Sequence, residues 1–140
     1  MRLLLDTCIV INLALEPESL NRDVFAMLYD YDNQLYMSME SVKEMIVAYR
    51  RKGLGRKLWK TEEDIITYIK DDLCIDILPI HEEHIRTYAR LIINEAQGHF
   101  DPSDHIIISH AITERMPLIS SDHKFDFYMS QGLQYVCNDR

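Results

Sequence analysis

The chain has 140 residues, of which 47% are hydrophobic and 27% charged, with four glycines and four prolines. This size and composition predict a single domain over residues 1–140 and exclude a linker-rich or low-complexity chain. The formal net charge of −8 argues against nucleic-acid binding through the overall field, unless acids gather at a cation site or the main partner is a basic protein segment.

Apolar periodicity and turn residues predict strands that alternate with helices. The predicted strands cover residues 3–5, 34–39, 74–80, 117–121 and 133–137, the last at a sheet edge. The predicted helices cover residues 9–15, 20–31, 41–50, 61–70, 82–97 and 101–115, with a basic loop over 50–57. Thr61 and Asp101 are expected to cap the helices that follow them. This alternation indicates a parallel sheet with helices on both faces, whose ligands collect beyond the carboxyl ends of the strands.

Carboxylates stand where these strands and helices meet. Asp6 and Asp122 follow buried strands, and Glu44 and Asp104 lie in the first turns of helices. Each of them also has an ordinary structural interpretation. These interpretations are an N-cap for Asp6, a capping box of Ser41 with Glu44, an N-cap for Asp101, a helix-dipole contact for Asp104 and a turn for Asp122.

The position of Asp104 supports a functional interpretation as well as the structural one. Ile107, Ile108 and Ala111 follow it by three, four and seven residues, so Asp104 lies on the face that its helix buries. A buried carboxylate is costly unless it is paired or binds a metal. Several acids at one sheet edge would also repel one another without a cation, and all-oxygen ligation favours Mg²⁺ or Mn²⁺ over zinc.

The histidines give no comparable pattern. His81 and His84 open a predicted helix and are expected at the surface, and His123 is expected to face solvent. His105 and His110 are five residues apart, so they do not share a helix face as a metal pair would.

The cysteines and the N-terminus bear on the compartment. Cys8, Cys74 and Cys137 form no C-x-x-C pair, which indicates neither a zinc knuckle nor a disulfide framework. Cys8 is expected to be a small buried hydrophobe. The apolar residues 3–5 are too few for a signal-peptide core, and no apolar run could span a bilayer. We therefore expect a cytoplasmic protein without a membrane partner.

Four segments resemble the PIN-domain nucleases, in the family's order and spacing and over nearly the whole chain. They are LLLDT near the N-terminus, SMESVKEM around Glu44, DPSDHIIISHA around Asp104 and LISSDHKF around Asp122. Each motif alone is weak, but four in sequence are specific. The chain looks most like the VapC-type toxins of bacterial and archaeal toxin–antitoxin pairs. It departs from them at Cys8, where many relatives carry Asn, and at His105, where Arg is common.

The resemblance implies an α/β fold, a PIN-like three-layer α/β/α domain with a central, mostly parallel sheet. It also implies an endoribonuclease that needs Mg²⁺ or Mn²⁺, a homodimer, and inhibition by an antitoxin whose basic tail would suit an acidic groove. On the motifs, the catalytic and metal-binding acids are Asp6, Glu44, Asp104 and Asp122. The positions that support them are Thr7, Asp101 and Ser121.

Other interpretations stay open. The basic residues Arg50, Arg51, Lys52, Arg56 and Lys57 either guide RNA or form a solvated loop. An aspartate-nucleophile phosphatase needs a second Asp two residues after the first, where Cys8 stands. A receiver domain needs paired acids at the first strand end and a late Lys, and the late strand gives Ser120-Ser121-Asp122. A non-catalytic, partner-binding module is the alternative from another class, and a metal titration or a cleavage assay would separate it from a nuclease.

Overall fold

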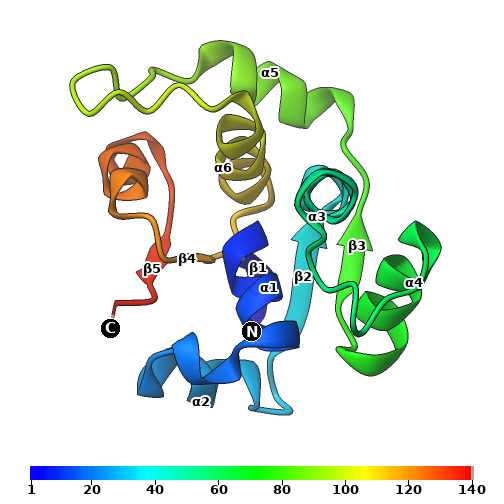
Figure 1. The fold of residues 1–140 in the computed structure, drawn as a ribbon. Coiled ribbons are helices and arrows are strands. Elements are labelled where there is room, and N and C mark those ends of the chain that lie inside the picture. Colours follow the sequence, from blue (N-terminus) through cyan, green and yellow to red (C-terminus); the bar gives the residue numbers. More distant parts are fainter. Residues whose placement is uncertain (140) are drawn as a thin grey trace.

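The computed structural model describes residues 1–139, in which helices cover both faces of a five-stranded sheet (Figure 1). The strands are β1 (Arg2–Leu5), β2 (Gln34–Ser38), β3 (Asp76–Leu78), β4 (Leu118–Ser120) and β5 (Tyr135–Cys137). Their order in the sheet is β3-β2-β1-β4-β5, and every neighbouring pair is parallel. The predicted α/β fold is confirmed, and the sheet is wholly rather than mostly parallel. The last strand lies at an edge, as predicted.

The helices begin at side chains that suit helix caps. The α-helices are α1 (Thr7–Leu15), α2 (Arg22–Leu28), α3 (Met39–Lys52), α4 (Glu62–Thr67), α5 (Glu82–Arg90) and α6 (Pro102–Glu114). Shorter helical segments are η1 (Pro17–Ser19), η2 (Tyr68–Asp72) and η3 (His123–Gln131). Both predicted caps are confirmed: Thr61 accepts a hydrogen bond from the backbone N–H of Asp64, at 3.2 Å, and Asp101 accepts one from Ser103, at 3.0 Å.

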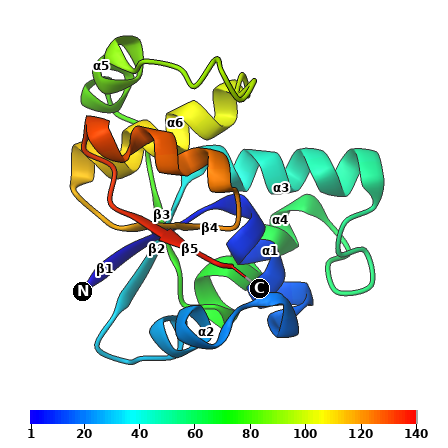
Figure 2. The same ribbon diagram turned by 90° about the vertical axis from the view of Figure 1, so that its left-hand side faces the viewer.

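The alternation of side chains along β1 separates two apolar cores. Leu3 and Leu5 pack in the core formed by α1, α2, α3 and α4, whereas Leu4 packs in the core of α6 and η3. Figure 2 shows α1, α2 and α4 on one side of the sheet and α5 and α6 on the other. The three-layer arrangement that the resemblance implied is therefore present.

One predicted helix is too long. The pattern predicted a helix over residues 82–97, but α5 ends at Arg90 and residues 91–101 form an irregular loop. The side chain of Gln131 makes two hydrogen bonds with the backbone of Ile92, at 2.9 and 3.0 Å, which holds this loop against η3. The face predicted to be buried is partly open: Ile85 is 44% exposed and Ile92 67%. The other predicted elements differ from the observed ones by three residues or fewer at each end.

The predicted surface position of His84 is also wrong. Its side chain is only 2% exposed, and both ring nitrogens have hydrogen-bond partners within the fold. Nδ1 accepts a hydrogen bond from the backbone N–H of His81 at 2.8 Å, and Nε2 lies 2.7 Å from a carboxylate oxygen of Glu114 on α6. His84 therefore joins the start of α5 to the end of α6, while His81 and His123 are exposed as expected.

Candidate functional site

The acids that the motifs single out lie at the carboxyl end of the sheet. Asp6 directly follows β1, and Asp122 lies two residues after β4. Glu44 is the sixth residue of α3 and Asp104 the third of α6. In Figure 1 the arrows of β2 and β3 point toward this end, where α3 and α6 lie. Helices α3 and α6 pack against each other, and α1 packs against α3 and β4.

Asp6 is buried and strongly hydrogen-bonded. Its Oδ1 accepts from the backbone N–H of Thr7 at 2.8 Å, which caps α1, and its Oδ2 accepts from the hydroxyl of Ser120 at 2.7 Å. Burial raises the pKa of this carboxyl, the hydrogen bonds oppose the rise, and the charge of Asp122 adds to it. The N-cap interpretation of Asp6 is therefore correct, and the same side chain also lies among the other acids.

Glu44 does not form the capping box that the sequence allowed. The N-cap of α3 is Ser38, whose Oγ accepts from the backbone N–H of Glu40 at 3.1 Å. Glu44 instead points across to α1, where its Oε1 accepts from the hydroxyl of Thr7 at 2.6 Å. Burial raises the pKa of Glu44, and the nearby charges of Asp6 and Asp101 act in the same direction.

Asp104 lies at the centre of the acids. Burial raises its pKa from 3.8 to about 8, and the charges of Asp6, Asp101, Glu44 and Asp122 contribute to the rise. Possible ligand atoms of Glu44, Asp101 and Asp104 lie within 4.8 Å of one another, and so do those of His99, Asp104 and Asp122. Asp104 belongs to both groups. Because the chain brings these carboxylates together, the cluster fits a hard divalent metal ion.

The seryl hydroxyl that contacts the acids is Ser120 rather than Ser121. Ser120 donates to Asp6 and accepts from the backbone N–H of Asp122 at 3.1 Å. The hydroxyl of Ser121 instead accepts from the side-chain amide of Asn138 at 3.0 Å. Asp122 also caps η3 through Lys124, at 2.9 Å, so the interpretation of Asp122 as a turn residue is correct as well.

Two further contacts were not foreseen. His99, on the loop over residues 91–101, places Nε2 2.9 Å from Oδ2 of Asp104. No periodic signal marks this histidine, because the pattern predicted a helix through residue 97. The thiol of Cys8 lies 3.5 Å from Oδ2 of Asp6, and burial raises the pKa of the thiol to about 12. Cys8 therefore packs as a protonated, half-buried side chain rather than serving as a nucleophile.

The five basic residues have separate surroundings. Arg51 and Lys52 line a hollow of about 350 Å³ together with Glu44. Arg50 pairs with Glu62 at 2.9 Å. Arg56 stacks on the ring of Tyr49 at 4.7 Å and donates to its carbonyl at 3.0 Å, and Lys57 is exposed. Of the five, Arg51 and Lys52 are therefore the ones placed beside the acids.

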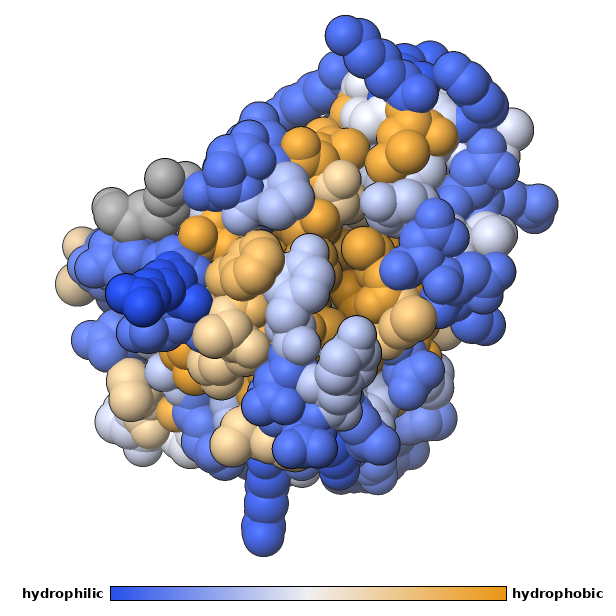
Figure 3. All heavy atoms as spheres, turned by 90° about the horizontal axis from the view of Figure 1, so that it is seen from below, coloured by the Kyte–Doolittle hydropathy of each residue, from blue (hydrophilic) through white to orange (hydrophobic). Residues whose placement is uncertain are grey.

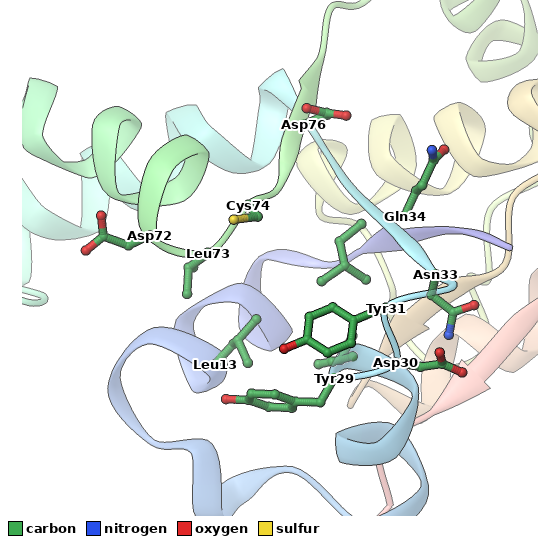
Figure 4. Close-up of a pocket in the computed structure, with 12 residues that line it drawn as sticks. Leu13, Tyr29, Asp30, Tyr31, Asn33, Gln34, Asp72, Leu73, Cys74 and Asp76 are labelled. Atoms are coloured by element: carbon green, nitrogen blue, oxygen red, sulfur yellow. The ribbon is translucent and has the colours of Figure 1, made fainter.

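A larger hollow of about 490 Å³ lies at the opposite end of the sheet, at the start of β2 and β3. Figure 3 views this end, with apolar residues gathered at its centre and hydrophilic residues around them. In Figure 4 the side chains of Leu13, Leu73 and Tyr31 face one another across the hollow, and acids stand at its margin. Those acids are Asp30, Asp72 and Asp76.

A match to a protein family covers the part of the chain that carries these acids. The sequence matches the model of the PIN domain over residues 3–128, a stretch that includes all four acids. The chain belongs to the PIN domain family. The resemblance drawn from the four motifs is confirmed.

Several solved structures share this PIN fold. VapBC2 from Rickettsia felis, bound to a DNA fragment from its promoter, has a chain with TM-score 0.70 and 19% identity, covering 99% of this chain and 100% of that one. A chain of VapBC-1 from nontypeable Haemophilus influenzae has TM-score 0.66 and 22% identity, with 98% of each chain covered. A chain of a toxin–antitoxin complex from Klebsiella pneumoniae has TM-score 0.62 and 19% identity, covering 99% of this chain and 98% of that one. No curated protein sequence matches this PIN chain. No helix within residues 1–139 is both long and apolar enough to cross a membrane.

Proposed function

We propose that this PIN-domain protein is a metal-dependent endoribonuclease, a VapC-type toxin that a partner antitoxin inhibits. The observation that carries the proposal is the crowding of Asp6, Glu44 and Asp104, whose pKa values are all raised, first by burial and then by neighbouring acids. Like charges this close destabilise a fold, so a cluster of this kind suits a bound cation.

The ligands in this proposal are the four acids Asp6, Glu44, Asp104 and Asp122. They offer oxygen atoms alone, which suit Mg²⁺ or Mn²⁺. When bound, such a cation supplies Lewis-acid chemistry, by which water becomes a stronger nucleophile and charge on the phosphate is neutralised. Thr7 orients Glu44 by donating to it, and Asp101 adds negative charge beside Asp104. The resemblance gave Ser121 a supporting position, but the hydroxyl that donates to Asp6 is that of Ser120.

The substrate path in this proposal runs along α3. Arg51 and Lys52 stand in the hollow beside Glu44, where they would attract the phosphates that flank the scissile bond. This placement reconciles the net charge of −8 with a nucleic-acid substrate, because attraction is needed only locally. Arg50 pairs with Glu62 at the start of α4, and Arg56 contacts Tyr49 of α3, so these two serve the substrate less directly.

The proposed partners are an antitoxin and a second copy of the chain. The similar structures include VapBC complexes and a toxin–antitoxin complex, which supports the first. An antitoxin segment with an apolar face and basic flanks would suit the hollow near Leu13, whose margin is acidic. The exposed Ile85 and Ile92 offer apolar surface for a homodimer.

The test is cleavage by the purified chain in EDTA and after addition of Mg²⁺ or Mn²⁺. RNA, single-stranded DNA and duplex DNA of one sequence are the substrates. We expect RNA cleavage only with metal, and its loss in Asp6→Asn and Asp104→Asn. Asp72→Asn, which removes an exposed acid far from the cluster, is the matched control. Undiminished cleavage by Asp104→Asn would reject the site. A wild-type chain that neither binds metal nor cuts would favour the non-catalytic module.

A further inference from the structure

A buried histidine lies between the proposed metal centre and the core. His99 is 3% exposed, and its ring is bonded at both nitrogens. Nε2 lies 2.9 Å from Oδ2 of Asp104, and Nδ1 lies 2.9 Å from the hydroxyl oxygen of Tyr128 on η3. The hydroxyl oxygen of Tyr128 in turn lies 3.1 Å from the backbone nitrogen of Asn94. A chain of three hydrogen bonds therefore runs from the backbone of the loop to an acid of the cluster.

The direction of each hydrogen bond follows from the donors available. The backbone N–H of Asn94 can only donate, so the oxygen of Tyr128 accepts there. Tyr128 is fully buried, and its own O–H proton needs an acceptor, which Nδ1 of His99 supplies. A neutral imidazole that accepts at Nδ1 carries its proton on Nε2. That proton points at Oδ2 of Asp104, so His99 is a donor to the acid.

The ring of His99 is fixed on its other sides as well. His105 donates from Nε2 to the backbone carbonyl of His99 at 2.9 Å, and the two rings meet edge to face with centroids 4.9 Å apart. The ring of Phe125 lies 5.4 Å away, between centroids. These contacts leave His99 little freedom to turn its ring or to leave Asp104.

We propose that Tyr128 and His99 form a positioning relay that fixes the Asp104 carboxylate, so that Oδ2 is held by His99 and Oδ1 is presented to the cation. The inference rests on the proposed function, because it concerns an acid of that metal centre. It assigns His99 as a positioning residue and not as a ligand, although its Nε2 lies within 4.8 Å of ligand atoms of Asp104 and Asp122. A ligand would need a bare Nε2, whereas Tyr128 directs the proton there.

The first test determines which ring nitrogen of His99 carries the proton in the metal-free full chain. Nitrogen-15 NMR distinguishes protonated from unprotonated ring nitrogens, and we expect His99 to carry its proton on Nε2. Tyr128→Phe removes the hydroxyl that fixes this tautomer, so a mixture of both tautomers is expected in that variant. A proton on Nδ1 in the wild-type chain overturns the relay.

The second test compares two amide variants in Mn²⁺ binding, measured by titration calorimetry and by the EPR signal of Mn²⁺. In His99→Gln the side-chain amide lies about as far from the backbone as Nε2 of histidine, so we expect its nitrogen still to donate to Asp104. In His99→Asn the amide lies about as far from the backbone as Nδ1, so we expect it to bond to Tyr128 and to leave Asp104 without a donor. We expect the Mn²⁺ dissociation constant to rise about 10- to 100-fold in His99→Asn and less than about threefold in His99→Gln.

The outcomes separate the relay from the metal centre. Thermal unfolding shows whether each variant is folded, and a purely structural role predicts the same change in Mn²⁺ affinity for both amides. Equal affinities in wild-type and His99→Asn protein overturn the relay and leave the metal centre intact. An imidazole nitrogen coupled directly to Mn²⁺ in pulsed EPR overturns it too, because His99 would then be a ligand. A wild-type chain that binds no Mn²⁺ overturns the proposed function, and with it the role of His99.

Discussion

Replacing Asp104 by Asn should stabilise the metal-free protein while it removes the centre of the proposed metal site. The pKa of Asp104 rises from 3.8 to about 8, first through burial and then through the charges of Asp6 and Asp101. Ionised Asp104 is therefore unfavourable in the folded chain. Asn keeps an oxygen that accepts from Nε2 of His99, so the substitution removes the charge and retains the hydrogen bond.

The size of the effect follows from the pKa of Asp104 in the folded and unfolded chains. Below pH 3.8 Asp104 is protonated in both the folded and the unfolded chain, so its raised pKa costs the wild type no stability. Above it the unfolded chain ionises while the folded chain does not, so the free energy of unfolding falls until the pH passes about 8. The 3.2 pH units between 3.8 and 7, at about 1.36 kcal/mol each, give about 4 kcal/mol at pH 7. At pH 4 Asp104→Asn should be more stable than the wild type by less than about 1 kcal/mol.

Urea unfolding in EDTA at pH 4 and pH 7 measures this difference. Asp72→Asn removes the same charge from an exposed position, and we expect it to change the free energy of unfolding by less than about 0.5 kcal/mol. Mn²⁺ should then stabilise the wild type and leave Asp104→Asn unchanged. An Asp104→Asn variant that is no more stable than the wild type at pH 7, or that gains the same stability at both pH values, would contradict the raised pKa of Asp104.

Three other predictions concern separate parts of the molecule. Burial, and next the charge of His84, lowers the pKa of His110 from 6.5 to about 4, so this residue alone should cost the wild type about 3 kcal/mol of stability as the pH falls from 6.5 to 4, against the opposite contribution of Asp104. The free energy of unfolding of His110→Leu should therefore rise relative to that of the wild type by about 3 kcal/mol between pH 6.5 and pH 4, and a difference that does not change with pH would contradict the assignment. Gly55→Ala would place a Cβ 2.3 Å from the ring of Trp59, so chemical denaturation should show a loss of about 1–3 kcal/mol, larger than for Gly98→Ala, where a Cβ on the same left-handed backbone would make only an ordinary contact, 3.9 Å from the ring of Phe100. Arg51→Glu should raise KM for RNA more than it lowers kcat, with a difference that shrinks at high salt, and a kcat effect alone would place Arg51 outside the substrate path.

The convergence of the acids could be predicted because parallel strands share their carboxyl edge. The three apolar residues Leu3–Leu5 predict a buried strand, and Asp6 follows it directly. The apolar residues before Asp122 predict a strand in the same way, and the cap at Asp101 predicts where α6 begins. These are local signals, each a few residues long. Once the sheet is parallel, local signals are sufficient to place such side chains at one edge.

The contacts between side chains could not be predicted in the same way. Two serines, Ser38 and Ser41, stand near the start of α3, and either could cap it by sequence alone. The structure uses Ser38, which moves Glu44 from the first turn to the sixth position of the helix and turns it toward Thr7. A shift of three residues in a cap thus decides whether Glu44 serves its own helix or faces the other acids.

His99 was missed for a related reason. The apolar spacing through Ile92 and Ile93 fits a helix, but the helix ends at Arg90, and the residues after it make hydrogen bonds with η3, more than thirty residues later. Sequence periodicity does not record such contacts. The segment that departs most from its local pattern is also the one that carries His99 to Asp104, as expected where tertiary contacts build a site against local preference.

The structural and functional interpretations of these acids are compatible rather than opposed. Asp6, Asp101 and Asp122 each cap a helical segment, and those segments begin at the carboxyl end of the sheet because they follow parallel strands or meet that edge. A cap on Asp101 or Asp122 occupies one carboxylate oxygen, so the second oxygen can serve a cation. Capping does not account for Glu44 and Asp104, which cap nothing, point inward and have raised pKa values. These two acids therefore fit a metal centre better than a set of helix caps, since a bound cation would offset the cost of burying their charged forms.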